Sequence, residues 1–189
     1  MFICEDELTR EKSLNQRNYW AFLAVGDDRS FAGNDGYDDE PRTRYCWDST
    51  VANHGRIKVG DVIVLWSKTG SIGVSIIETI EIRDSTKMTH RCPFCKKSNI
   101  KKRLTKMPQY RCNRCKETFE RPESRRVNVV NYISTHSGHW IPLWEVLEAS
   151  VMRSCCLSPK SQLSLRPLDW SKFETALRHR GIALKLDKT

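Results

Sequence analysis

The sequence predicts an α+β fold that is mainly β, built as a small curved β-barrel with short flanking helices and one inserted module. Three observations lead to this prediction. Short apolar runs rich in β-branched and aromatic residues are separated by turns that contain Gly or Pro. One segment between two such runs differs from the rest in charge and cysteine content. A clear helical pattern appears near the end of the chain.

The first half of the chain predicts two strands joined by long irregular segments. The aromatic-rich run 18–25 predicts the first strand, and a Gly-, Asp- and Asn-rich loop follows over 26–44. Residues 45–57 predict a short helix or a turn. After a turn at Lys58 to Asp61, the apolar run 62–66 predicts a buried strand.

Further strands are predicted on both sides of the inserted module. Residues 72–82 form a long β-branched run after a turn at Gly70, and alternation resumes over 126–134. The apolar stretch 140–146 contains Pro142, which indicates a strand edge or a turn.

Helices are expected at the two ends of the chain. Residues 1–17 are polar, with Thr9 as a capping residue. Ser171 and Glu174 form a capping box, and Gly181 is a suitable residue just past a helix end. The second pattern predicts a helix from about 171 to 180.

Length and composition indicate a globular chain. It has 189 residues, of which 39% are hydrophobic and 29% charged, which suits one domain with a small added module. The longest apolar runs have about five residues, so a transmembrane helix of roughly 20 is not expected. Met1 to Lys12 contain no apolar signal region, and we therefore expect an intracellular protein, located in the cytoplasm of a prokaryotic cell.

The basic charge is concentrated in one segment. Arg83 to Arg126 contain fifteen Lys or Arg and four Asp or Glu, whereas the rest of the chain is nearly neutral. A basic module on a neutral body predicts a phosphate-binding surface, although a solvated Lys/Arg face is the simpler alternative. The residues predicted to contact a nucleic-acid backbone are Lys68, Lys101, Lys102, Arg103, Lys106, Arg125 and Arg126.

Four of the eight cysteines have the spacing of a structural zinc site. They form two C-x2-C pairs separated by sixteen residues, and each pair can aim two thiolates at one point. Two disulfides are the alternative, which suits a chain without a secretion signal poorly. The predicted Zn²⁺ ligands are Cys92, Cys95, Cys112 and Cys115.

Tryptophans beside polar residues suggest a pocket for a planar ligand. Trp47 lies among short polar residues, and Trp66 ends a strand at an expected barrel mouth. An aromatic ring at such a place can stack on a nucleobase while polar neighbours contact its edge; core packing is the alternative. The predicted base pocket comprises Trp47, Asp48, Ser49, Asn53, Trp66, Ser67 and Trp20.

Motifs for catalysis are scarce. There is no P-loop, no G-x-G-x-x-G and no G-x-S-x-G, and His136 and His139 form the single close histidine pair. We therefore expect a chain that is not itself an enzyme, with a hydrolase based on these two histidines as an alternative.

The body of the chain resembles the EVE and YTH domains of the PUA-like superfamily. The matching pieces occur in order over most of residues 18–180 outside the module. They are the opening strand Asn18 to Phe22, the W-S-T-like segment Trp47 to Thr50 with Asn53, the K-x-G-D, strand, turn and returning strand from Lys58 to Glu78, and the closing segment Ser161 to Leu168 with the Phe173 helix after it. Asp48 interrupts the W-S-T spacing by one residue, and the basic module is not part of a minimal EVE or YTH domain.

The resemblance implies a PUA-like domain over 1–83 and 126–189 with a zinc ribbon inserted at 84–125. It also implies a reader of a modified base, most plausibly methylated or hydroxymethylated cytosine, or methyladenine, in double-stranded DNA. The base would be flipped into a pocket walled by Trp47 and a second ring, with Trp66, Trp20 and Trp140 as candidates.

EVE-like domains serve as specificity modules of modification-dependent restriction endonucleases, including those of the HNH type. The resemblance therefore also implies a fused or partner nuclease domain. A reader of modified RNA, as YTH domains are, and a zinc-ribbon module that binds another protein are the remaining alternatives.

Overall fold

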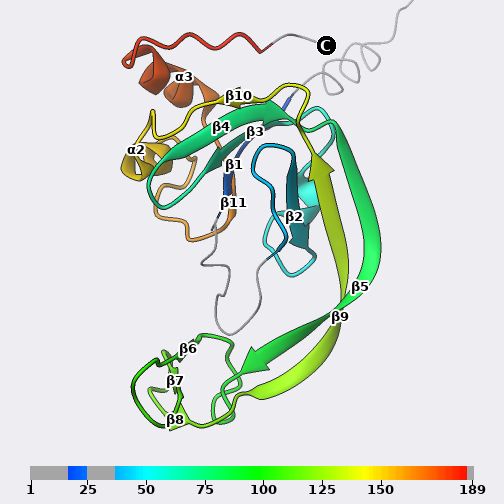
Figure 1. Ribbon diagram of the computed structural model, residues 1–189, viewed down its shortest axis with the longest axis vertical. Coiled ribbons are helices and arrows are strands. Elements are labelled where there is room, and N and C mark those ends of the chain that lie inside the picture. Colours follow the sequence, from blue (N-terminus) through cyan, green and yellow to red (C-terminus); the bar gives the residue numbers. More distant parts are fainter. Residues whose placement is uncertain (1–16, 25–36, 187–189) are drawn as a thin grey trace, which may run out of the picture.

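The computed structural model describes residues 17–24 and 37–186, and it is mainly β with few, short helices (Figure 1). The helical segments are η1 (His54–Arg56), α2 (Ala149–Ser154) and α3 (Trp170–Arg178). The strands are β1 (Tyr19–Leu23), β2 (Arg44–Asp48), β3 (Val62–Trp66), β4 (Ser71–Ile76), β5 (Thr79–Arg91), β6 (Ile100–Lys102), β7 (Tyr110–Cys112), β8 (Thr118–Phe119), β9 (Glu123–Thr135), β10 (Ile141–Pro142) and β11 (Leu165–Pro167).

The described strands form three open sheets. A five-stranded sheet has the order β10-β4-β3-β1-β11, in which β1 and β3 are parallel and the other neighbours antiparallel. A three-stranded antiparallel sheet has the order β2-β9-β5, and β6-β7-β8 form a small third sheet. Hydrogen bonding within the described residues therefore gives separate sheets and no single closed barrel.

Strand β3 lies at the centre of the body and is buried on both faces. Val62, Val64 and Trp66 pack into the apolar cluster that contains α2 and α3. Ile63 and Leu65 pack into a second cluster, which lies between the five-stranded sheet and the sheet of β2 and β9. Since both faces are covered, this strand is an unbroken apolar run, and for that reason its bounds are evident in the sequence.

Several predicted elements differ from the structure. The helix or turn predicted over 45–57 is wrong at its start, because residues 45–48 belong to β2, which pairs with β9. Within the predicted segment only η1 is helical. The strand predicted over 72–82 is two strands, because the chain turns a corner at Ile77 and Glu78 between β4 and β5. Helix α2 was not predicted. The helix expected at 1–17 and most of the loop at 26–44 lie outside the described residues.

The closing helix was predicted correctly, but its cap was not. The N-cap of α3 is Asp169, whose carboxylate accepts a hydrogen bond from the backbone amide of Lys172 (3.2 Å), and Ser171 lies within the first turn. Gly181 follows the helix with a φ of 74°, as expected for the residue that ends a helix.

Strands β5 and β9 extend far beyond the body. They pair along all thirteen residues of each strand, whereas β2 covers only Asn131 to Thr135 of β9. Residues 84–91 and 123–130 thus form a two-stranded arm, which at about 3.4 Å per residue is roughly 27 Å long. The arm curves away from the body and carries residues 92–122, the ribbon, at its far end (Figure 1). The insertion bounds predicted at 84 and 125 fall inside these two continuous strands.

Candidate functional site

The four paired cysteines converge at the end of the arm. Their Sγ atoms all lie within 4.8 Å of one another, so the group can hold a metal ion. The Sγ atoms of Cys92 and Cys115 are 3.6 Å apart, and those of Cys95 and Cys112 are 3.5 Å apart. Both distances are far longer than the ~2.05 Å of a disulfide, and all four thiols are free.

Each C-x2-C pair lies on a turn of the same backbone geometry. The amide of Lys96 donates to the carbonyl of Cys92 (2.9 Å), and the amide of Lys116 donates to that of Cys112 (3.1 Å). Lys96 and Lys116 both adopt left-handed conformations, with φ of 59° and 67°. Two equivalent turns therefore face each other, an arrangement that directs four thiols to one point.

The ribbon has little else to hold it together. Its buried cluster consists of Cys92, Cys112, Ile100 and Phe119.

Around Cys112, burial raises the thiol pKa, but hydrogen bonds from the backbone amides of Cys115 and Arg114 outweigh it and lower the pKa to about 6. A single thiolate, at Cys112, is thus favoured within the group of four cysteines, whereas the pKa of Cys115 is lowered by a backbone hydrogen bond from Glu117 but raised overall by burial and by hydrogen bonds with the neighbouring thiols.

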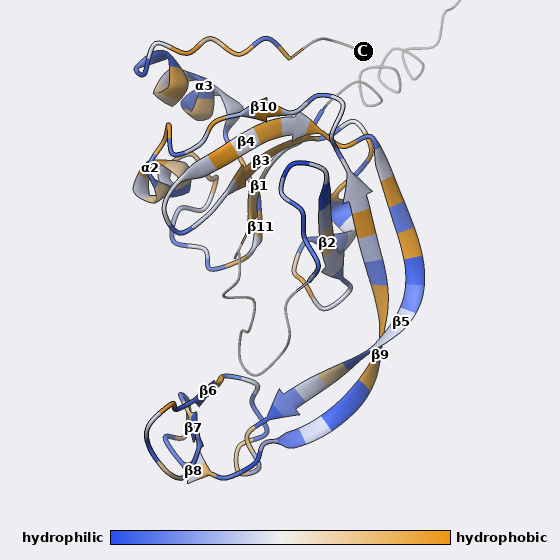
Figure 2. Ribbon diagram, viewed as in Figure 1, coloured by the Kyte–Doolittle hydropathy of each residue, from blue (hydrophilic) through white to orange (hydrophobic). Residues whose placement is uncertain are grey.

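The arm and the ribbon present a basic surface. Of the fifteen Lys and Arg from Arg83 to Arg126, thirteen are exposed. Figure 2 shows mostly hydrophilic colours where β5 and β9 approach the ribbon, in contrast with β3 and β11 of the body.

Most of the predicted backbone-contacting residues lie on this surface. Lys101 and Lys102 lie on β6, and Lys106 lies in the loop that follows. Arg125 and Arg126 lie on β9 and pair with Thr89 and Met88 of the arm. The exposed basic residues that the prediction did not name are Lys96, Lys97, Arg111, Arg114, Lys116 and Arg121 of the ribbon and Arg83 and Arg91 of β5. The high net positive charge of the segment was the sequence feature that could have identified these residues.

Two predicted backbone contacts are not part of this exposed surface. Arg103 is half-buried, and its guanidinium donates to the carbonyl of Pro108, so its side chain closes a loop of the ribbon. Lys68 lies in the turn between β3 and β4, in the body rather than on the arm.

The structure shows no open ring face at Trp47, where the base pocket was predicted. The indole is 1% exposed, and its ring stacks on Tyr132 with centroids 5.4 Å and planes 4° apart. Phe22 contacts it edge-on at 6.1 Å, and its Nε1 donates to the carbonyl of His54 (3.2 Å). The stacking face that a base would need is therefore occupied by Tyr132, which the sequence analysis did not single out.

The polar neighbours of Trp47 bind other parts of the protein. Asp48 is 1% exposed and accepts hydrogen bonds from Lys87 Nζ (2.8 Å) and from the amide of Thr50 (2.7 Å). Ser49 Oγ accepts from the amide of Val130 (3.0 Å). Asn53 Nδ2 donates to the carbonyl of Leu165 at 2.9 Å. These side chains join strands and do not line a pocket.

The other predicted pocket residues do not converge with Trp47. Trp20 is 2% exposed, and its Nε1 donates to Asp61 Oδ2 (2.9 Å). Trp66 is fully buried on the opposite face of the five-stranded sheet, and the guanidinium carbons of Arg153 and Arg166 lie 5.2 and 4.9 Å from its ring centroid. Ser67 Oγ lies 2.8 Å from Thr69 Oγ1 in the following turn. All three therefore have structural roles.

The histidine pair is split between two environments. His136 is buried, and its Nε2 lies 3.0 Å from the carbonyl of Pro41; burial lowers its pKa. His139 Nδ1 lies 3.8 Å from Glu78 Oε1. Trp140, the third candidate for a cage wall, packs its indole against Gly73, where an added Cβ would lie 2.2 Å from the ring.

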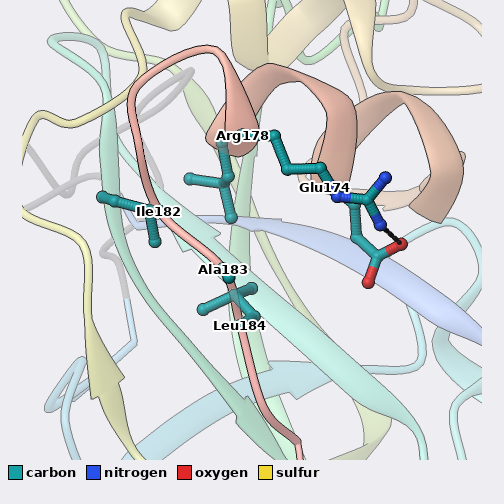
Figure 3. Close-up of a pocket in the computed structure, with 6 residues that line it drawn as sticks. Glu174, Arg178, Ile182, Ala183 and Leu184 are labelled. Atoms are coloured by element: carbon teal, nitrogen blue, oxygen red, sulfur yellow. Dashed lines mark ion pairs between the residues drawn. The ribbon is translucent and has the colours of Figure 1, made fainter.

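A small hollow lies between α3 and residues 182–184 (Figure 3). Its volume is about 60 Å³, and an ion pair between Glu174 and Arg178 (3.5 Å) lies at its edge. Ligand pockets usually have 300–1,000 Å³, so this hollow is too small for a nucleotide. Within the described ranges, no helix has the length and apolarity needed to cross a bilayer.

Comparisons with known proteins found no relative. No protein-family model, no curated protein and no solved structure matches the chain. The features of this chain that bear on its function are therefore the arm and the four-cysteine centre.

Proposed function

We propose that this chain is a nucleic-acid-binding module whose arm and ribbon hold the phosphate backbone, with Zn²⁺ as the metal of the four-cysteine centre. The observation that carries the proposal is the exposed basic surface, which coincides with a structural unit that projects from a nearly neutral body.

The distribution of the charge favours a polymer over a small anion. The exposed Lys and Arg of the arm are Arg91, Arg125 and Arg126, which lie in the half of the arm next to the ribbon, and most of the others lie over the ribbon beyond it. Among the described residues, Arg83 forms an ion pair with Glu81, and Lys96 pairs with Glu123 at 2.5 Å. Arg103 donates to the carbonyl of Pro108 and Lys116 Nζ to the carbonyl of Asn113 (2.6 Å), and the other exposed ribbon cations remain for phosphates. Double-stranded DNA offers one negative charge per ~1.7 Å of its axis. Duplex DNA is thus the ligand that we propose first.

Zinc is the metal that suits four thiolates in a closed site. Soft thiolate ligands favour Zn²⁺, Cu⁺ or iron–sulfur clusters. A tetrahedral Zn–S₄ site with ~2.3 Å bonds has sulfur–sulfur distances of about 3.8 Å, close to the 3.5 and 3.6 Å found here. The metal would supply stability that the few apolar residues of the ribbon do not, so its role is structural.

The resemblance of the body to EVE and YTH domains supports a second, finer proposal. The layered, mainly β body is compatible with a PUA-like domain, and such a domain would add recognition of a modified base to backbone binding. Trp47 cannot be the platform for that base, because Tyr132 covers its ring. Modified-base recognition thus rests on the resemblance alone and is tested separately.

The test is a salt titration of binding to a fluorescent 20-base-pair duplex. Each phosphate contact contributes about 0.9 to the slope of log K against log salt. Replacing Lys101, Lys102 and Lys106 with Ala together should therefore reduce the slope by about 2–3. Lys160→Ala, at an exposed lysine of the body, is the matched control and should leave the slope unchanged. Binding that is absent, or that is insensitive to salt and to the triple variant, refutes the proposal.

The same titration separates the finer proposals. Duplexes with cytosine, 5-methylcytosine, 5-hydroxymethylcytosine or N6-methyladenine test base recognition, and single-stranded RNA with the same modification tests an RNA reader. Equal affinity for modified and unmodified duplexes removes the reader role and leaves backbone binding intact.

A further inference from the structure

The ribbon displays two large apolar side chains to solvent. Residues 103–109 form the loop between β6 and β7, and in it Leu104 is 94% exposed and Met107 is 73% exposed. They are the most exposed large hydrophobic residues of the described part of the chain.

The loop that carries them is closed by hydrogen bonds. The amide of Arg103 donates to the carbonyl of Gln109 (2.7 Å), and Arg103 Nε donates to the carbonyl of Pro108 (2.9 Å). The arginine side chain thus bridges the two ends of the loop. Leu104 and Met107 are held outward on a closed loop instead of packing against the Ile100–Phe119 cluster.

Exposed lysines neighbour the two apolar side chains in the sequence. Lys101 and Lys102 precede Leu104 on β6, and Lys106 lies between Leu104 and Met107; all three lysines are exposed. An apolar tip within a basic surface matches a ligand that has anionic groups beside an apolar interior. Duplex DNA has this character, because the stacked bases lie between two phosphate backbones.

We propose that Leu104 and Met107 form a wedge that enters between two stacked base pairs of duplex DNA, while the neighbouring lysines hold the flanking phosphates. This inference rests on the proposed function and adds how the ribbon deforms its ligand. Leu and Met are among the residues that proteins insert between base steps, which partly unstacks the step and bends the duplex. Pyrimidine–purine steps unstack most easily, so TA and CA steps are the preferred sites.

An anionic membrane is the competing partner for a basic loop with an apolar tip. The arm favours the duplex, because Arg91, Arg125 and Arg126 extend the basic surface back along the arm, away from the two-residue tip. Such an elongated surface follows a polymer, whereas a bilayer is contacted by a broad apolar face.

The experiment uses the full chain and a duplex with 2-aminopurine at a single TA step, whose fluorescence rises on unstacking. Binding is measured on the same samples by anisotropy. The wild-type chain should raise the fluorescence, and the double variant Leu104→Ala, Met107→Ala should abolish the rise and weaken binding by about tenfold with an unchanged salt slope. Leu157→Ala, at a 63% exposed leucine of the body, is the matched control and should change neither signal.

Four outcomes overturn the wedge. A bound duplex without a fluorescence change, or a rise that survives in the double variant, refutes it while the proposed function stands. Binding to vesicles of anionic lipid that requires Leu104 and Met107 would assign the loop to a membrane. Absence of duplex binding by anisotropy refutes the proposed function and the wedge together.

Discussion

Lys87 is the basic residue of the arm whose replacement should change folding and leave nucleic-acid binding intact. Its ammonium lies 2.8 Å from Asp48 Oδ2, and the two side chains are 23% and 1% exposed. Burial alone would raise the pKa of Asp48, but hydrogen bonds from Lys87 and Thr50 hold it below its usual value. In Lys87→Met the carboxylate would remain buried without its cation.

The size of the effect follows from this geometry. Removing one partner of a buried ion pair typically costs about 3–5 kcal/mol. Lys87 is partly exposed, and Asp48 keeps its bonds from Thr50, so we expect a loss of about 2–3 kcal/mol of unfolding free energy. For a chain of this length that loss corresponds to a Tm decrease of roughly 5–10 °C. The contribution of Asp48 is present above its unfolded pKa, near 3.9, and is lost as the pH falls below that value.

Urea denaturation of four proteins measures the pair: the wild type, Lys87→Met, Asp48→Asn and the double variant. The double variant should be less destabilised than the two single changes added together, because the second change removes the group that the first left unpaired. The salt slope of duplex binding should match that of the wild type. A Lys87→Met protein of unchanged stability would refute the structural role of Lys87, and a reduced salt slope would show that Lys87 contacts phosphates.

Three further predictions concern the metal centre and the body. A strong chelator, or Cys112→Ser, should abolish hydrogen-exchange protection in β6–β8 while β3 of the body stays protected; equal loss in both regions would contradict a local role of the metal. Trp47→Ala should cost about 3–5 kcal/mol in urea denaturation and shift affinity for modified and unmodified duplexes equally; a selective loss for the modified duplex would restore the pocket. His136 is neutral in the fold because burial lowers its pKa, so the unfolding free energy should decrease as the pH falls below about 6.5, and His136→Gln should flatten that dependence.

The sequence was informative wherever one local pattern determines the structure. The spacing of the four cysteines was enough to predict their convergence, because each C-x2-C turn is a local backbone geometry. The unbroken apolar run of β3 follows from burial on both faces. The net charge of the inserted segment can be counted from the sequence alone, whereas its division into a ribbon and an arm requires the tertiary structure.

Features that depend on distant residues were missed. The corner at Ile77 separates β4 from β5, but the β-branched run continues through it and looks like one strand. The length of the arm was missed because residues 84–91 are polar and resemble a loop, although the alternation over 126–134 was recognised as a strand. In the described part of the chain, residues 84–91 and 123–130 pair with each other and with no third strand.

The polar cluster beside Trp47 explains why a pocket was predicted and why there is none at that ring. Short polar residues next to an aromatic residue occur where a ligand's edge is recognised, and they also occur where side chains join neighbouring strands by hydrogen bonds to the backbone. The sequence does not distinguish the two cases, but the hydrogen-bond partners do. Asp48 accepts from Lys87 and Thr50, and Asn53 donates to Leu165 across 112 residues of sequence. Because these groups already bond to the protein and Tyr132 covers the ring, a base entering here would have to displace native interactions before it gained any.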